Sequence, residues 1–184
     1  MKRSLVAALV GIAFVPFAAH AQKRSTHTTS SVKPVEFGIS GGAALPTSDL
    51  SDGANTGFNL TGTIGWNPQM IPLGIRVDGA YNRFGLKGGA SGDIHFTSVT
   101  GNLVYKIPAA SVSPYLIGGA GWYNAAVNLT GFGSGSDNHL GWNVGGGLNM
   151  PLSGFNTFIE ARYNQVQGDG GSLKFIPITF GVMF

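Results

Sequence analysis

The segment Phe58-Asn59-Leu60-Thr61-Gly62-Thr63-Ile64-Gly65-Trp66 alternates, position by position, between an apolar set and a small or polar set. Successive side chains of a β-strand point to opposite faces, so this period of two predicts a strand with one apolar face. The other face carries Asn, Thr and Gly, and it holds no charged residue. The segment therefore predicts a strand whose two faces meet very different surroundings.

Seven further runs show the same alternation, and Gly-, Ser-, Asn-, Asp- or Pro-containing links separate them. They cover residues 35–45, 75–82, 98–107, 115–123, 140–150, 159–164 and 176–184. The longer links, at 47–57, 85–92, 127–138 and 167–172, alternate with shorter ones, and no helical pattern of useful length is present. Most runs reach, or can be extended to, the roughly 9–11 residues of a tilted membrane-spanning strand. The pattern predicts an all-β fold of eight antiparallel strands running up and down.

Two runs fit this pattern less well. In the fifth run we assign Tyr115, Ile117 and Tyr123 to the apolar face, although Leu116 and Trp122 lie on the other face. In the last run Pro177 has no N–H to donate to a neighbouring strand, and a closed barrel has no free edge for it. We expect a bulge or a local break at Pro177.

The composition excludes several classes of protein. The chain has 184 residues, 30 glycines, no cysteine, 43% hydrophobic residues and only 10% charged residues, against roughly 25% charged residues in a typical soluble domain. Without cysteine there is no disulfide framework and no thiolate zinc site. The formal net charge is +3, and there is no basic face of the kind that nucleic-acid binding needs.

The N-terminus has the layout of a secretory signal peptide. Met1-Lys2-Arg3 is basic, an apolar stretch follows, and Ala19-His20-Ala21 fits a small-x-small cleavage site. A membrane anchor is the alternative, but the apolar stretch is short for a span of about 20 residues. We predict a signal peptide at residues 1–21, a flexible polar extension at 22–34 and a barrel domain at 35–184.

The chemistry of the polar face distinguishes two kinds of barrel. A soluble ligand-binding barrel points its apolar residues inward, whereas a membrane-spanning barrel points them toward lipid. Small uncharged residues are unusual on a water-facing exterior, but they suit a crowded interior. Aromatic residues also lie near the ends of many runs, as the girdles of a membrane barrel would: Phe37, Trp66, Tyr81, Tyr105, Tyr123, Trp142, Tyr163 and Phe184. The sequence therefore favours a closed transmembrane β-barrel.

The chain resembles the small eight-stranded outer-membrane β-barrels of Gram-negative bacteria, the OmpX/Ail and OmpA transmembrane-domain type, within the porin-like superfamily. The signal peptide, the apolar/small alternation at 114–121 and 142–147 and the C-terminus carry the resemblance. In that family an apolar alternation ending in Phe is read by the outer-membrane assembly machinery. The matching residues here are Ile176, Ile178, Phe180, Val182 and Phe184. The resemblance implies a monomer in the cell outer membrane, among lipid and lipopolysaccharide, with four loops outside.

The lumen face holds three acidic and three basic residues, which predict a balanced charge network, since an unpaired buried charge is costly. They are Glu36, Arg76, Asp78, Lys106, Glu160 and Arg162. The network either fills and rigidifies the interior or forms a gated ion path. We expect no catalytic residues, because neither His95 nor His139 has a serine at the spacing of a lipid A deacylase. We expect no cofactor and no metal, because the chain has no phosphate-binding glycine motif and too few acidic clusters for a hard cation.

Three functions follow as hypotheses. The first is a non-catalytic surface or envelope protein that supports membrane integrity or adhesion by binding an unknown ligand through its loops. The second is a narrow pore of low conductance. The third is an enzyme that modifies lipid A.

Overall fold

The computed structural model describes residues 35–68, 71–88, 92–109, 111–129, 133–152, 154–168 and 171–184. The predicted signal peptide and the extension at 22–34 lie outside these residues. In the described part, no helix is long and apolar enough to cross a membrane. The elements are β1 (Val35–Thr47), α1 (Asp49–Gly53), β2 (Gly57–Trp66), β3 (Leu73–Gly85), β4 (Gly92–Lys106), β5 (Ser113–Leu129), β6 (Gly133–Leu152), β7 (Phe155–Gly168) and β8 (Gly171–Met183).

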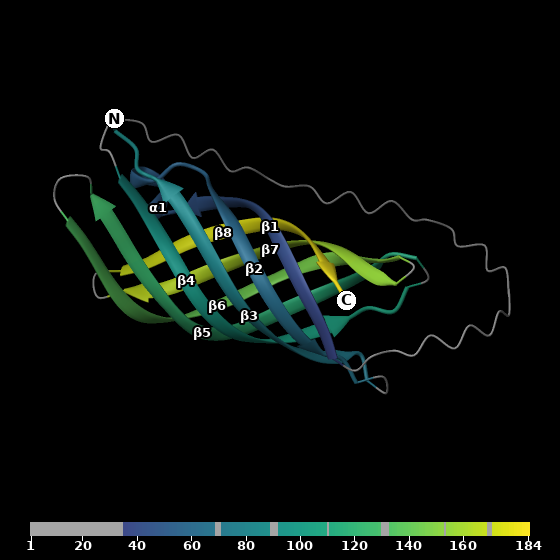
Figure 1. Ribbon diagram of the computed structural model, residues 1–184. Helices are drawn as coiled ribbons and strands as arrows, with labels where there is room; N and C mark the ends of the chain where they lie inside the picture. The colour runs from purple at the N-terminus through teal and green to yellow at the C-terminus, as the bar shows by residue number, and fades with distance from the viewer. Residues whose placement is uncertain are drawn as a thin grey trace, which may run out of the picture. The chain divides into compact units, whose positions relative to one another are not determined.

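The eight strands form a closed barrel in which each strand pairs antiparallel with its neighbours in sequence (Figure 1). Pairing of β1 with β8 closes the sheet. Beyond the last residue of β8, Phe184 and Phe37 exchange backbone hydrogen bonds, with N···O distances of 2.7 and 3.1 Å. The predicted all-β, up-and-down barrel is therefore confirmed. The end that carries α1 and the β3–β4, β5–β6 and β7–β8 connections is called the outer end below, and the opposite end the inner end.

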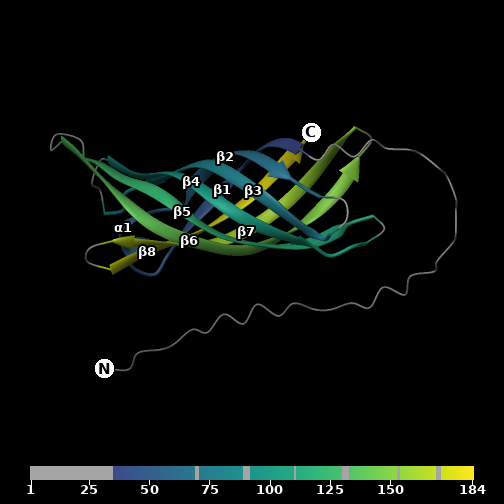
Figure 2. The same ribbon diagram turned by 90° about the horizontal axis from the view of Figure 1, so that it is seen from below.

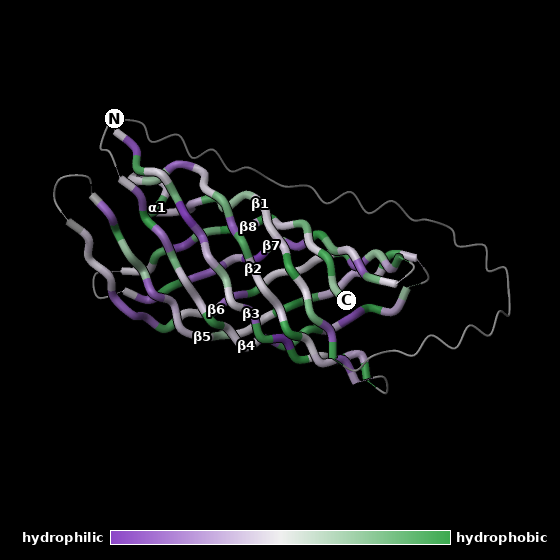
Figure 3. The backbone as a smooth tube through the Cα atoms, in the orientation of Figure 1, coloured by the Kyte–Doolittle hydropathy of each residue, from purple (hydrophilic) through white to green (hydrophobic). Residues whose placement is uncertain are grey.

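The apolar face of the alternation lies on the outside of the barrel, as predicted. Large apolar side chains such as Ile39, Ile64 and Leu103 are more than half exposed, whereas Thr63 and Asn102 are buried inside. Apolar and hydrophilic residues consequently mix along the strands (Figure 3). A soluble barrel with an apolar pocket would require the reverse arrangement, so that alternative is wrong.

The assignment of faces on β5 was wrong. Tyr115, Ile117 and Tyr123 point into the lumen and are at most 5% exposed, whereas Trp122 is 69% exposed on the outside. Both faces of this strand carry large apolar residues, so alternation alone could not orient it. Tyr123 therefore belongs to the interior and not to the aromatic girdle.

Pro177 produces a local break without a bulge. The pairing of β7 with β8 stops at Ala161↔Ile178 and resumes at Asn164↔Phe175, so the ladder is interrupted opposite Pro177 while the register stays constant. On the other side, Pro177 still lies opposite Ala44 of β1. Of the two expectations, the break is confirmed and the bulge is not.

Two predicted links are more structured than expected. Most of 127–138 belongs to β5 and β6, which pair from Ser113↔Asn149 to Leu129↔Gly133. The link at 47–57 contains the short helix α1, whose Leu50 is buried inside the outer end. In both ribbon views the β5–β6 hairpin reaches beyond the ends of β7 and β8 (Figure 1, Figure 2). The short helix α1 therefore covers part of the outer end, and the β5–β6 hairpin projects beyond the neighbouring strands there.

Glycines inside the barrel allow neighbouring backbones to approach closely. A Cβ added at Gly121 would collide with the Val99 carbonyl oxygen, whereas one added at the outward-facing Gly101 would meet nothing within 4 Å. We expect Gly121→Ala to lower the free energy of unfolding by about 1–3 kcal/mol through overpacking, and Gly101→Ala to change it little. Urea unfolding in lipid vesicles measures both; equal effects would contradict this reading of the interior.

Candidate functional site

Four charged side chains meet at the centre of the lumen, and they are called the central quartet here. Arg76 and Asp78 come from β3, and Glu160 and Arg162 from β7. Within each strand the two residues are two positions apart, so both face inward. Arg76 lies 3.1 Å from Asp78 and 3.1 Å from Glu160, and Arg162 lies 2.8 Å from Asp78 and 2.6 Å from Glu160. Each arginine thus bridges both carboxylates.

Neutral side chains complete the coordination of the quartet's oxygens. The Thr63 hydroxyl donates to Asp78 at 2.6 Å, Asn102 Nδ2 donates to Asp78 at 2.9 Å, and the Tyr115 hydroxyl donates to Glu160 at 2.8 Å. Every carboxylate oxygen of the quartet therefore has at least two partners. This full satisfaction is what a buried charge cluster requires in a low-dielectric interior.

The other two predicted lumen charges form a separate pair near the inner end. Lys106 Nζ lies 3.9 Å from Glu36 Oε2, and Asn67 also donates a hydrogen bond to Glu36. The Lys106 side chain is 36% exposed, in contrast to the buried quartet. The six charges are thus arranged as a cluster of four and a pair, not as one network.

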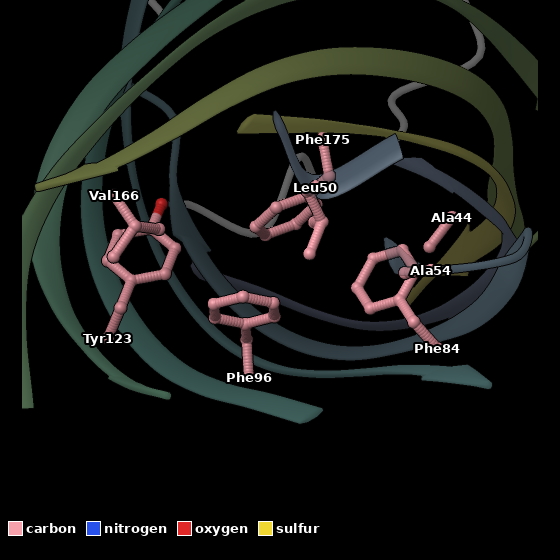
Figure 4. Packing of buried hydrophobic residues seen from close by; sticks show 8 residues of the cluster. All are labelled: Ala44, Leu50, Ala54, Phe84, Phe96, Tyr123, Val166 and Phe175. Carbon is pink, nitrogen blue, oxygen red and sulfur yellow. The ribbon is translucent and has the colours of Figure 1, made fainter. Parts of the chain in front are cut away.

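Aromatic residues fill the outer end of the lumen, and sequence reasoning missed them. Phe84, Phe96 and Phe175 are fully buried, and Leu50 of α1 packs with them. Their side chains point toward one another across the barrel (Figure 4); the Phe96 and Phe175 rings are stacked with centroids 5.1 Å apart. This cluster is called the outer plug. Continuing the period of two beyond the predicted runs would have placed all three phenylalanines on the lumen face.

The lumen is narrow at its inner end as well. Val104, Ile117, Phe158 and Met183 are buried there, and the Arg76 guanidinium lies 5.5 Å from the centroid of the Phe158 ring. Among the described residues, the lumen contains cavities of about 40 and 30 Å³, each large enough for a few water molecules. Side chains therefore fill the interior, as is expected for eight strands.

His95 and His139 lie near the outer end of the barrel, and Ser134 and Ser136 line the same hollow as His95. His95 Nδ1 is 3.3 Å from Asp93 Oδ2, and His139 lies opposite Tyr123 in the strand register. Within the described ranges, no serine hydroxyl forms a hydrogen bond with either ring.

The C-terminal alternation faces outward. Ile178, Phe180 and Phe184 are about half exposed on the outside of the barrel. Ile176 and Val182 share their face by alternation along β8. The five residues therefore form one apolar row on the outer surface of the closing strand.

The β5–β6 hairpin has one unpaired edge. Pairing of β6 with β7 begins at Gly141↔Val166. Among the described residues, positions 133–140 of β6 pair with β5 and have no partner on β7. The side chains of Ser134, Ser136 and Asp137 there are exposed. A strand edge of this kind presents free backbone N–H and C=O groups to solvent.

Comparison with known proteins agrees with this geometry. A family model described as the outer membrane protein beta-barrel domain matches residues 5–184. Neisserial surface protein A has 21% identity to the chain and a TM-score of 0.68, with 82% of this chain and 96% of that chain covered. The attachment invasion locus protein Ail of Yersinia pestis, in complex with the heparin analogue sucrose octasulfate, has 26% identity and a TM-score of 0.50, with 83% and 100% covered. No curated protein sequence matches the chain.

Proposed function

Because the chain belongs to the outer membrane protein beta-barrel domain family and is an integral protein of the outer membrane, we propose that it acts there without catalysis, through surface contacts. It contributes to envelope integrity or to adhesion by means of its outer loops. The filled lumen supports this proposal, because activity then has to reside on the exterior. The similar barrel Ail, named the attachment invasion locus protein, supports the same role.

The feature that carries the proposal is the unpaired edge of β6 at 133–140. An extended peptide can add to such an edge as a further strand, with backbone hydrogen bonds supplying affinity. Serine, glycine and aspartate occupy much of this edge, so a partner's backbone would meet no bulky side chain at those positions. We propose an extended segment of a surface-exposed protein as the partner.

A proline scan through positions 134–139 tests the edge. In an antiparallel strand, backbone N–H groups point alternately to the two sides, so every second position donates toward the free edge. We expect proline at those positions to reduce adhesion of cells that display the protein, with the barrel still folded. Proline at the intervening positions should instead loosen the β5–β6 pairing. Adhesion that is unaffected by the whole scan would contradict the proposed binding mode.

We also propose how the protein reaches the outer membrane and in what form it resides there. Residues 1–21 direct export and are removed, which leaves Gln22 as the first residue. The apolar row that ends in Phe184 is recognised by the outer-membrane assembly machinery, and the barrel is a monomer surrounded by lipid and lipopolysaccharide. Support comes from the sequence layout at 1–21 and from the outward orientation of Phe180 and Phe184.

A further inference from the structure

The outward face of β2–β6 changes from apolar to polar within a few rows of cross-strand neighbours. One row contains Gly62, Gly79, Val99, Trp122 and Leu140. The next row toward the outer end contains Leu60, Tyr81, Thr97, Asn124 and Asn138. The third contains Phe58, Arg83, His95, Ala126 and Ser136. Since aromatic residues mark the membrane interface of such barrels, the third row lies at the height of the lipid headgroups.

Two hollows lie in this polar zone. The first, of about 370 Å³, is bordered by Phe58, Arg83 and Asp93, and three glycines leave it open. The second, of about 260 Å³, is bordered by His95 and by asparagine and serine side chains: Asn124, Asn128, Ser134 and Ser136. The contact between Asp93 and His95 joins their borders. The first hollow is mainly apolar and the second mainly polar, and both lie directly above the lipid-facing surface.

The charges in this zone compensate each other. Arg83 Nη2 lies 3.1 Å from Asp93 Oδ1, and His95 Nδ1 lies 3.3 Å from Asp93 Oδ2. An incoming phosphate would meet a guanidinium that is already paired and the carboxylate of Asp93, which repels it. The hollows therefore do not have the charge expected of a phosphate site.

The remaining groups match a sugar. Amide and hydroxyl groups both donate and accept hydrogen bonds, as sugar hydroxyls do. The Tyr81 ring lies below the hollows, with centroids 5.9 Å from Phe58 and 5.7 Å from His95, and such rings offer an apolar surface to the C–H groups of a sugar. We propose that the two hollows bind uncharged sugar units of the glycolipid in the outer leaflet. This site goes beyond the proposed surface contacts and rests on the proposed lipopolysaccharide surroundings of the barrel. It uses the side chains of Ser134 and Ser136, whereas the β6 edge offers the backbone groups of the same segment.

The test measures binding of purified lipopolysaccharide to the folded protein in detergent, using tryptophan fluorescence, since Trp122 is two residues from Asn124 on the same face. Three probes are compared: lipopolysaccharide with a complete sugar core, a form without core sugars, and a dephosphorylated form that keeps the sugars. We expect the two sugar-bearing forms to bind alike and the truncated form to bind about tenfold more weakly, as the loss of one or two hydrogen bonds implies.

The double variant Asn128→Ala/Ser136→Ala should weaken binding of the complete form about tenfold without affecting the truncated form. Gln165→Ala, on the outward face of β7 and outside both hollows, is the matched control and should bind normally. A heat-shift gel verifies that each variant is folded. Binding that is lost on dephosphorylation, on Arg83→Gln or at high salt would reveal a phosphate site and overturn the proposal. Equal binding of the complete and truncated forms would overturn it as well.

Discussion

Replacing Glu160 with leucine should lower the free energy of unfolding by about 3–5 kcal/mol, the cost of breaking a buried ion pair on one side. Glu160 faces Arg76 and Arg162, and all three side chains are at most 10% exposed. Without Glu160, only Asp78 would remain to balance the two arginines, and the Tyr115 hydroxyl would lose its acceptor. Urea unfolding in lipid vesicles, followed by tryptophan fluorescence, measures the loss.

Glu36→Leu is the matched control for this variant. Glu36 faces a single lysine that is 36% exposed, at 3.9 Å, and such a partly solvated pair contributes about 0–1 kcal/mol. If Glu160→Leu lowers the free energy of unfolding by less than 1 kcal/mol, the two arginines of the central quartet do not depend on both carboxylates for neutralisation.

Replacing Phe96 with alanine should cost about 3–5 kcal/mol, the range for truncating a buried aromatic residue in a packed core. Phe96 is fully buried in the outer plug. Its ring stacks on Phe175 and meets Phe84 edge-on at 5.9 Å. The neighbouring strands are fixed by barrel closure and cannot collapse into the cavity that alanine would leave. The same unfolding experiment measures this effect.

Phe37→Ala is the control for the plug. Phe37 is 57% exposed on the lipid-facing surface, where lipid chains can occupy the space left by its ring. Its truncation should therefore cost clearly less than that of Phe96. Equal losses would mean that the outer plug is not packed as a core.

The fold could be predicted from sequence because lipid and lumen impose opposite preferences on alternate residues. FNLTGTIGW at 58–66 shows this directly, and β2 spans Gly57–Trp66. The prediction of strand positions was less accurate beyond the part of the barrel that lies between lipid and lumen. Residues 133–140 of β6 extend past the last pairing with β7, so neither lipid nor a lumen imposes a pattern there. Residues 133–138 were therefore assigned to a link.

The sequence predicted which charged residues face the lumen, but not which of them contact one another. Alternation placed Arg76, Asp78, Glu160 and Arg162 on the inward face. That β3 and β7 bring their charges together is decided by closure of the barrel, which no local pattern encodes. The outer plug was missed because a polar lumen was expected along its whole length, whereas Phe84, Phe96 and Phe175 exclude water at one end.

A role in surface contacts requires a sealed interior, and single-channel recording of the purified wild-type protein in a planar lipid bilayer tests this most directly. In the described part of the chain, the outer plug, the central quartet and the inner residues Val104 and Phe158 occupy the lumen, beside cavities of about 40 and 30 Å³. We expect no defined conductance steps. Reproducible steps of one size would show that ions pass through the lumen, and they would make the protein a narrow pore instead of a surface-contact protein.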